Sequence, residues 1–386
     1  MTDIILPFRV PETAYVGVGA VSRLGVEARS LGGKRALIVT DKGVAGAGIA
    51  EQTRRILEAE GVEAIIFDGS AAEPPFENVD EALEICRSID ANIVVGVGGG
   101  SALDVAKGCA AMITNPGRLL DYAGTDKIPN RALPMIALPT TSGTGSEATP
   151  NAIFTDVQAK LKKGVVSPYL IPRVAIVDPA LTLSAPAGVT AATGMDALTH
   201  AVESYTSRKA TAQSELYSLE AIRLIALALR TAVHDGPNLE ARRSMAIASF
   251  FAGIAIGNAG TAAVHALAYP LGGQFHIPHG VANALMLPYV LEVNCVGNLA
   301  KFADVAEAMG EPIDGLSPRD AAHAAVDACR QISIDVGIPQ RMRDVNVTAE
   351  AIPGMAEQAS QTARLMDNNP RKLSLKDVRA IYEAAW

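Results

Sequence analysis

The sequence has few cysteines and no long hydrophobic run. Its 386 residues include four cysteines, which lie far apart and form no C-x-x-C pair. Neither a disulfide framework nor a thiolate zinc site is therefore expected, and a reducing compartment fits. The longest apolar stretch, MAIASFFAGIAIG, is shorter than the roughly 18 residues of a membrane span. The start of the chain, MTDIILPFRV, lacks the features of a signal peptide. We expect a cytoplasmic protein with no membrane partner.

Clustered positive charge is also missing. The net charge is -8, and no block of lysine and arginine occurs, which argues against nucleic acid as a partner. With 49% hydrophobic and 19% charged residues, the chain can bury a sizeable core in two or three domains. The composition indicates a globular protein that acts on a small molecule.

Short apolar runs alternate with helical patterns between residue 34 and about residue 180. The runs are RALIVTD, VEAIIFDG, NIVVGVGGG, PMIALPTT and VAIVDP, and amphipathic stretches such as GIAEQTRRILEAEG separate the first three. This order is typical of a doubly wound sheet. Strands this apolar are buried on both faces, which favours a mainly parallel sheet.

The pattern changes near residue 185, where the predicted strands stop. Long alanine- and leucine-rich stretches follow, such as SELYSLEAIRLIALALRTAV, and their period is helical. We therefore expect an α/β domain at residues 1–185 and an all-helical domain at residues 186–386.

Two loops of the first half are suited to hold phosphate. In NIVVGVGGGSALDVAKG a strand passes through Gly98, Gly99 and Gly100 into a helix near Ser101, so free backbone N–H groups would face an anion. Ser101 replaces the last glycine of the G-x-G-x-x-G fingerprint, and a tight turn without a ligand is the alternative. The second loop, LPTTSGTGSEAT, is rich in hydroxyl groups, which bind phosphate or ribose or satisfy a turn.

Asp41 ends RALIVTD, the first of the short apolar runs. A carboxylate at a strand end accepts hydrogen bonds from a ribose diol and repels a 2′-phosphate, which would select NAD over NADP. The alternative is that Asp41 only caps the next turn. The sequence alone does not decide between the two.

Histidines gather in the second half of the chain. Five of the six fall within eighty residues, and the candidates among them are His200, His265, His276 and His279. Asp196 and His200 are four residues apart and would share one face of a helix. We expect Pro270 to break the helix of His265 and His279 to open the next helix, so that a turn brings both together. Three imidazoles and one carboxylate suit Fe²⁺, Zn²⁺ or another divalent transition ion, although a single histidine is more often a core residue.

These segments resemble the iron-containing, or group III, alcohol dehydrogenases. The resemblance is carried by GGGSALDVAK, PTTSGTGSEAT, ATGMDALTHAVESY, HIPHGVANALMLPYV and NPRKLSLKDVRAIYEAAW, in the order of that family. It implies a dinucleotide-binding α/β domain, a helical domain, and a divalent metal in the cleft between them. It also implies NAD as cofactor, Fe²⁺ or alternatively Zn²⁺ as metal, and a homodimer.

The resemblance also implies the site residues. The metal ligands would be Asp196, His200, His265 and His279. The cofactor residues would be Asp41, Gly98, Gly99, Ser101, Asp104, Thr140, Thr141 and Lys162.

The chain departs from the family pattern at two places. Tyr269 stands where many members have a further histidine, one turn after His265. We expect Tyr269 to orient substrate through its O–H, with aromatic packing as the alternative for Tyr269. The proton would then pass to water or through His276. The segment AEPPFENV replaces a P-N-P-type block, so no cofactor contact is transferred from it.

The expected activity is hydride transfer between NAD(H) and a small primary alcohol or aldehyde, of the short alcohol, diol or hydroxyacid type. One alternative is a hydroxyacid–oxoacid transhydrogenase with a tightly held cofactor. Another is an NAD- and metal-dependent lyase similar to dehydroquinate synthase, which would call for a lysine and arginine cluster that residues 196–279 do not show. A non-catalytic binding protein is the third alternative.

Overall fold

Six strands form one parallel sheet in the computed structural model, which describes residues 6–159 and 161–386. The strand order is β1-β9-β6-β4-β2-β3. The bounds are β1 Thr13–Val16, β2 Arg35–Val39, β3 Glu63–Phe67, β4 Ile93–Gly98, β6 Met135–Pro139 and β9 Val174–Val177. The five apolar runs are β2, β3, β4, β6 and β9, and their pairings are parallel. The expected doubly wound parallel sheet is confirmed.

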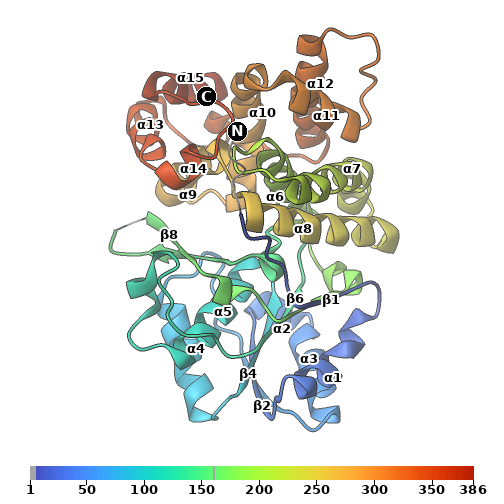
Figure 1. Cartoon of the computed structure of the whole chain (residues 1–386), viewed down its shortest axis with the longest axis vertical. Helices are drawn as coiled ribbons and strands as arrows, with labels where there is room; N and C mark the ends of the chain where they lie inside the picture. The colour runs from blue at the N-terminus through green and yellow to red at the C-terminus, as the bar shows by residue number, and fades with distance from the viewer. Residues whose placement is uncertain (1–5, 160) are drawn as a thin grey trace. The chain divides into compact units, whose positions relative to one another are not determined.

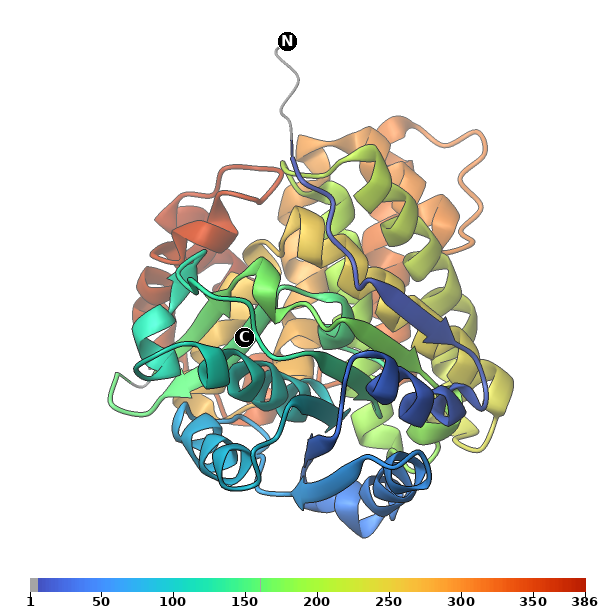
Figure 2. The ribbon, with the colours of Figure 1, turned by 60° about the horizontal axis from the view of Figure 1, so that its bottom comes forward.

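Strand β2 is buried on both faces because helices cover both sides of the sheet. Leu37 and Val39 pack into one core with α4 (Glu77–Ser88) and α5 (Gly100–Thr114). Ala36 and Ile38 pack into a second core with α1 (Leu24–Ser30) and α3 (Ile49–Ala59). Figures 1 and 2 show α4 and α5 on one side of the strands and α1 and α3 on the other.

The winding direction of the sheet reverses between β2 and β4. From β2 the chain passes through α2 (Lys42–Gly46) and α3 to β3 at the edge, and it then returns through α4 to β4 on the other side of β2. In open α/β sheets, ligands bind beyond the carboxyl ends of the strands at such a reversal. Asp41 and the glycine turn after β4 lie at this place.

A second, three-stranded sheet of order β5-β8-β7 was not expected from the sequence. Its strands are β5 Gly124–Thr125, β7 Asn151–Asp156 and β8 Leu161–Val166. The segment LKKGVV carries two lysines and a glycine, so it lacks the apolar signal of the other strands. In the antiparallel pair of β7 and β8, Thr155 faces Lys162.

Helices make up the chain beyond residue 186, and its described residues form no strand there. They are α6 Ala187–Thr206, α7 Ala212–His234, α8 Leu239–Ala259, α9 Ala263–Phe275, α10 His279–Asn294, α11 Leu299–Ala308, α12 Pro318–Asp335, α13 Ile352–Ser360, α14 Ala363–Met366 and α15 Leu375–Ala385. Helix α6 packs along α7 and α10, and α9 packs against α10 and α13. The expected helical second half is confirmed.

The prediction that Pro270 breaks its helix was wrong. Pro270 lies inside α9, which continues to Phe275, and Pro288 lies inside α10. Each proline removes one backbone hydrogen bond from its helix. Both prolines are buried, so packing against neighbouring helices compensates for that loss.

Contacts divide the chain into two units. One contains Pro11–Pro186 together with Gly236–Phe250, and the other contains residues 6–10, Ala187–Asp235 and Phe251–Trp386. The predicted division between residues 185 and 186 differs from these units at two segments. Residues 6–10 belong to the helical unit, and Gly236–Phe250 belongs to the α/β unit.

One described helix, His279–Gly297, is long and apolar enough to cross a membrane. The bent pair of helices Leu239–Ala259 and Ala263–Phe275 would be a second candidate if the two were counted as one span. In His279–Gly297, 61% of the apolar window is buried inside the protein. A core helix of a folded domain has the same character.

Candidate functional site

Asp196 and His200 lie one turn apart on α6, as their spacing predicted. Their side chains are 3% and 6% exposed, and Nε2 of His200 lies 3.8 Å from Oδ1 of Asp196. A carboxylate and an imidazole therefore meet in an otherwise apolar part of the helix.

The other two expected ligands come from α9 and α10. His276 ends α9 with a left-handed backbone at φ 56°, and α10 begins at His279. Nε2 of His265 and Nε2 of His279 lie 3.8 and 3.9 Å from Oδ1 of Asp196. The rings of His200 and His265 stack with centroids 4.8 Å apart. The structure thus brings the four expected ligands together, and we call them the ligand cluster.

Asn283 of α10 tests whether a cation fits the ligand cluster. Its Nδ2 lies 2.7 Å from Oδ1 of Asp196 and 3.1 Å from Nε2 of both His265 and His279. An amide has two hydrogens for these three acceptors, and its buried Oδ1 has no partner in the described part of the chain. The acceptor atoms of Asp196, His265 and His279 therefore outnumber the two amide hydrogens of Asn283. A divalent ion bound among these three residues would satisfy their lone pairs. The nitrogen and oxygen donors fit Fe²⁺ or Zn²⁺.

Asp196 stays ionised although it is buried. Burial alone would raise the pKa of this carboxyl, but the imidazoles of His200, His279 and His265 and the amide of Asn283 lower the pKa to about 2. The buried Asp196 carboxylate is therefore a suitable ligand for a cation.

Glu203 is a second buried carboxylate, which the sequence analysis missed. It lies one turn beyond His200 on α6, is 3% exposed, and accepts a hydrogen bond from Nδ1 of His265 at 2.6 Å. The backbone N–H groups of Ala262 and Val264 donate to the same carboxylate. The spacing of four and then three residues along one helix face was the available signal.

Tyr269 lies beside the ligand cluster, and α9 is helical at this position as expected. The ring centroids of Tyr269 and His279 are 6.3 Å apart. Burial raises the pKa of the Tyr269 phenol, while nearby Arg364 acts in the opposite direction. His276 is exposed and forms the turn before α10.

The two oxygens of Asp41 have different surroundings. Oδ1 accepts hydrogen bonds from the backbone N–H groups of Gly43 at 2.8 Å and Val44 at 3.0 Å, so it caps α2. A Cβ placed on Gly98 would lie 3.4 Å from Oδ2, so that oxygen faces the glycine turn. The capping role is therefore present, and it occupies only Oδ1.

The glycine turn and the hydroxyl-rich loop interlock. A Cβ on Gly100 would lie 2.5 Å from Cγ2 of Thr144, and a Cβ on Gly99 would lie 3.3 Å from Oγ1 of Thr141. Side chains at the glycines would push the two loops apart. The N-terminus of α5 has no side-chain cap, so its first N–H groups are suited to an anion.

The remaining expected cofactor residues have partners within the protein. The hydroxyl of Ser101 donates to the carbonyl of Ala72, and the N–H of Thr140 donates to the carbonyl of Gly98 at 3.0 Å. Nζ of Lys162 forms an ion pair with Oε1 of Glu73 at 2.9 Å. Asp104 accepts hydrogen bonds from Oγ of Ser146 at 2.7 Å and from the N–H of Ile153 at 2.8 Å. Both oxygens of Asp104 hold neighbouring backbone and side chain, so this residue positions the loops.

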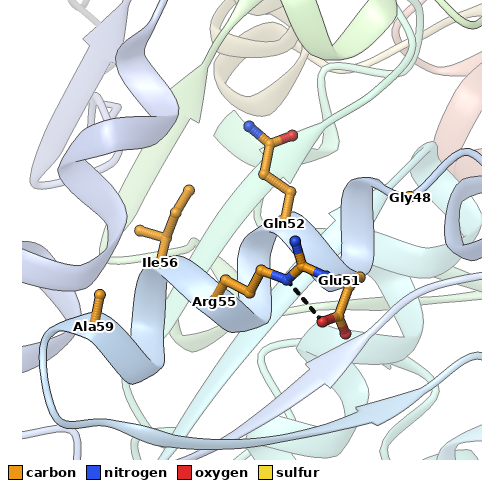
Figure 3. Close-up of a pocket in the computed structure, with 6 residues that line it drawn as sticks. All are labelled: Gly48, Glu51, Gln52, Arg55, Ile56 and Ala59. Atoms are coloured by element: carbon orange, nitrogen blue, oxygen red, sulfur yellow. Dashed lines mark hydrogen bonds and ion pairs between the residues drawn. The ribbon is translucent and has the colours of Figure 1, made fainter.

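A shallow hollow of about 490 Å³ is lined by one face of α3, at Gly48, Glu51, Gln52, Arg55, Ile56 and Ala59. Figure 3 shows the side chains of Glu51 and Arg55 turned toward each other, and they form an ion pair at 3.0 Å. None of the expected site residues lines this hollow.

Two family models match most of the chain. Residues 11–179 match iron-containing alcohol dehydrogenase, and residues 190–386 match the C-terminal part of the Fe-containing alcohol dehydrogenase family. The chain belongs to the iron-containing alcohol dehydrogenase family. The expected family and the expected class, an NAD-dependent alcohol dehydrogenase, are confirmed.

Curated relatives and solved structures agree with this membership. The chain is 44% identical to 1,3-propanediol dehydrogenase of Citrobacter freundii over 100% of both chains. It is 42% identical to long-chain-alcohol dehydrogenase 1 of Geobacillus thermodenitrificans, covering 97% of this chain and 95% of the relative. A solved 1,3-propanediol oxidoreductase superposes with a TM-score of 0.97 at 44% identity, covering 99% of this chain and 100% of that chain.

Proposed function

We propose that this enzyme transfers a hydride between NAD(H) and a small primary alcohol or its aldehyde, with Asp196, His200, His265 and His279 holding a divalent metal. The metal is Fe²⁺, with Zn²⁺ as the alternative. The convergence of the four ligand side chains around Asn283 carries this proposal. Relatives of similar identity are named for a three-carbon diol and for long-chain alcohols.

A bound divalent ion lowers the pKa of an alcohol hydroxyl and polarises an aldehyde, while NAD carries the redox step. His279 is 31% exposed and Asp196 is 3% exposed, so substrate approaches from the side of His279. Tyr269 lies on that side, and its raised pKa keeps the phenol protonated to orient substrate by donating a hydrogen bond. We assign proton exchange with solvent to His276, because it is exposed in the turn between α9 and α10.

The proposed NAD site lies where β2 and β4 end. Oδ2 of Asp41 binds the ribose diol, and the backbone at Gly98, Gly99 and Ser101 binds phosphate. Thr140, Thr141 and Lys162 supply further polar contacts, and Asp104 holds the loops. The glycine turn facing Oδ2 of Asp41 supports this assignment.

Arg364 favours an acid-bearing substrate as the second candidate. It lies on α14, which packs against α9, and its guanidinium is exposed near Tyr269. This guanidinium, which also hydrogen-bonds the Tyr269 phenol, would bind a carboxylate at the far end of a hydroxyacid.

We further propose a cytoplasmic homodimer. β1 is an edge strand of the sheet, and Val16 at its end and Val18 just beyond it are 42% and 54% exposed. Light scattering of the purified protein tests this, and a monomeric mass contradicts it.

The proposed function is tested with purified enzyme, NAD and matched substrates, including 1,3-propanediol and 3-hydroxypropionate. Reduction of NAD with the diol supports the first candidate, and preference for the acid supports the second. His279→Ala is expected to lose bound metal and turnover together while NADH binding persists. His323→Ala is the matched control, because both histidine side chains are 31% exposed and His323 lies outside the ligand cluster. Full metal occupancy in His279→Ala would exclude the proposed ligand set.

A further inference from the structure

The carboxylate of Glu203 links helix α6 to the start of helix α9. Its Oε2 accepts hydrogen bonds from the N–H of Ala262 at 2.9 Å and from Nδ1 of His265 at 2.6 Å. Its Oε1 accepts one from the N–H of Val264 at 2.6 Å. Three donors therefore share one carboxylate that is 3% exposed.

The bond to His265 decides which ring nitrogen carries the proton. Both oxygens of Glu203 already accept backbone N–H groups, so Oε2 faces His265 as an acceptor and Nδ1 of His265 is the donor. Nε2 then presents a lone pair, and it lies 3.8 Å from Oδ1 of Asp196 inside the ligand cluster. A carboxylate that accepts the other ring N–H of a metal-binding imidazole orients the ring and raises its basicity.

The bonds to Ala262 and Val264 fix where α9 begins. Ala262 is the N-cap of α9 and has no side chain that could cap the helix. Glu203 satisfies two backbone donors that the helix start would otherwise leave unpaired in the interior. The same carboxylate therefore sets both the backbone and the ring of His265, the third residue of α9.

We propose that Glu203 is the positioning residue of His265, which holds this ligand in the tautomer and orientation that a metal requires. The inference rests on the proposed metal site. It deepens that site by adding a residue that touches neither metal nor substrate. Asp196 and His200 act directly on the cation, whereas Glu203 acts through His265.

The test is the affinity of the whole enzyme for Zn²⁺, measured by competition with a colorimetric chelator after the native metal is removed. Glu203→Gln keeps the shape of the side chain but replaces one acceptor oxygen by a donor. We expect it to weaken Zn²⁺ binding by about 10- to 100-fold. A buried capping role alone would lower thermal stability and leave the affinity unchanged.

Asp178→Asn is the matched control for that structural role. Asp178 is 1% exposed and accepts hydrogen bonds from the N–H groups of Val21 at 3.1 Å and Ala180 at 3.0 Å, in the unit that lacks the ligand cluster. We expect this variant to lose stability and to bind Zn²⁺ like the unmodified enzyme.

A double-mutant cycle isolates the action through His265. In a His265→Ala background, adding Glu203→Gln is expected to change the Zn²⁺ affinity less than about twofold, because the positioned ligand is gone. An equal loss in both backgrounds would overturn the proposal. If Glu203→Gln does not fold, Glu203→Asp in the same cycle keeps the charge and withdraws it by one methylene, and the same dependence on His265 is expected.

The results separate this inference from the proposed function. Unmodified enzyme that binds no Zn²⁺ contradicts the metal site itself. Unmodified enzyme that binds Zn²⁺, with Glu203→Gln binding equally well, overturns only the role of Glu203.

Discussion

Asp41 caps a helix, and we propose that the same carboxylate also binds the ribose of the cofactor. Oδ1 caps α2 through Gly43 and Val44, while Oδ2 faces the glycine turn. The two readings of this residue in the sequence, cap or ribose ligand, are compatible because the oxygens point to different partners. A substitution that removes only the charge can separate them.

Asp41→Asn is that substitution. The amide oxygen keeps the cap, and the neutral side chain no longer repels a 2′-phosphate. Removing a repulsion of roughly 1 to 3 kcal/mol should raise the ratio of kcat/KM with NADP to that with NAD by about 5- to 150-fold. Steady-state kinetics with both cofactors measures this ratio. An unchanged ratio would restrict Asp41 to capping α2.

Single residues also show where sequence reasoning stops. Asp196 and His200 were found because their spacing of four residues is local and helical. Glu203 has the same kind of spacing, but its partner His265 lies 62 residues away. Asn283 reaches the cluster from 87 residues beyond Asp196. Contacts of that separation depend on how helices pack, which composition and period do not describe.

At the scale of elements, strands with apolar residues on both faces were predictable, and mixed segments were not. β2 and β4 are almost entirely buried, and their sequences are continuous apolar runs. The β7–β8 pair lies partly in solvent and carries Lys162 and Lys163, so its period is weak. Pro270 misled the helix prediction because a buried interior proline is tolerated when surrounding helices hold the backbone.

The packing of α10 on α6 depends on Gly280, which follows the ligand His279. A Cβ on Gly280 would lie 2.4 Å from the carbonyl oxygen of Ala192 on α6. Gly280→Ala should therefore move α10 away from Asp196, lower stability by about 1 to 3 kcal/mol, and weaken Zn²⁺ binding about tenfold or more. Thermal unfolding and chelator competition measure the two effects.

Gly354→Ala is the control for Gly280→Ala. Gly354 lies within α13 and would have nothing within 4 Å of an added Cβ. Alanine is the better helix former, so this variant should be more stable by roughly 0.5 to 1 kcal/mol and should bind Zn²⁺ normally. Equal metal affinity in the two variants would contradict the role of close packing at Gly280.

Glu147 of the hydroxyl-rich loop is expected to make the stability of the protein depend on pH. Burial raises the pKa of Glu147 to about 7, against the opposing effect of Lys107. Below the ordinary pKa of 4.5, the carboxyl is protonated in the folded and unfolded states alike. As pH rises from about 4.5 to about 7, only the unfolded carboxyl ionises, so the raised pKa causes a loss of stability across that range.

Glu147→Gln removes this titration. The variant should be more stable than the unmodified enzyme at pH 8 by a few kcal/mol, because one unit of pKa is about 1.4 kcal/mol, and the gain should shrink toward pH 4.5. Lys107 keeps its three acceptors at Thr149 and Asn151 in the variant. Urea unfolding at several pH values measures the difference. A gain that is the same at both ends of the range would contradict the assignment.

At the scale of the whole molecule, the two proposed sites lie on different parts of the chain. The ligand cluster comes from α6, α9 and α10, and all expected cofactor residues lie between positions 41 and 162. This separation was predictable because the change from alternating strands to helical periods is a property of long stretches. The chain does not divide at a single residue, however, since Gly236–Phe250 joins the α/β unit.

Removing the metal should therefore abolish turnover without abolishing NADH binding. Chelated enzyme is expected to lose turnover and regain it with Fe²⁺ or Zn²⁺, while its NADH affinity stays within about twofold. Metal at a thousand times its Kd stabilises a protein by about 4 kcal/mol, so the thermal midpoint should fall on chelation and depend on metal concentration. Hydrogen exchange should accelerate in α6, α9 and α10, where the ligand cluster lies, and stay slow in β2 and β4. Faster exchange in β2 and β4, or a parallel loss of NADH binding, would contradict this division. Either result would mean that the metal also stabilises the dinucleotide-binding sheet.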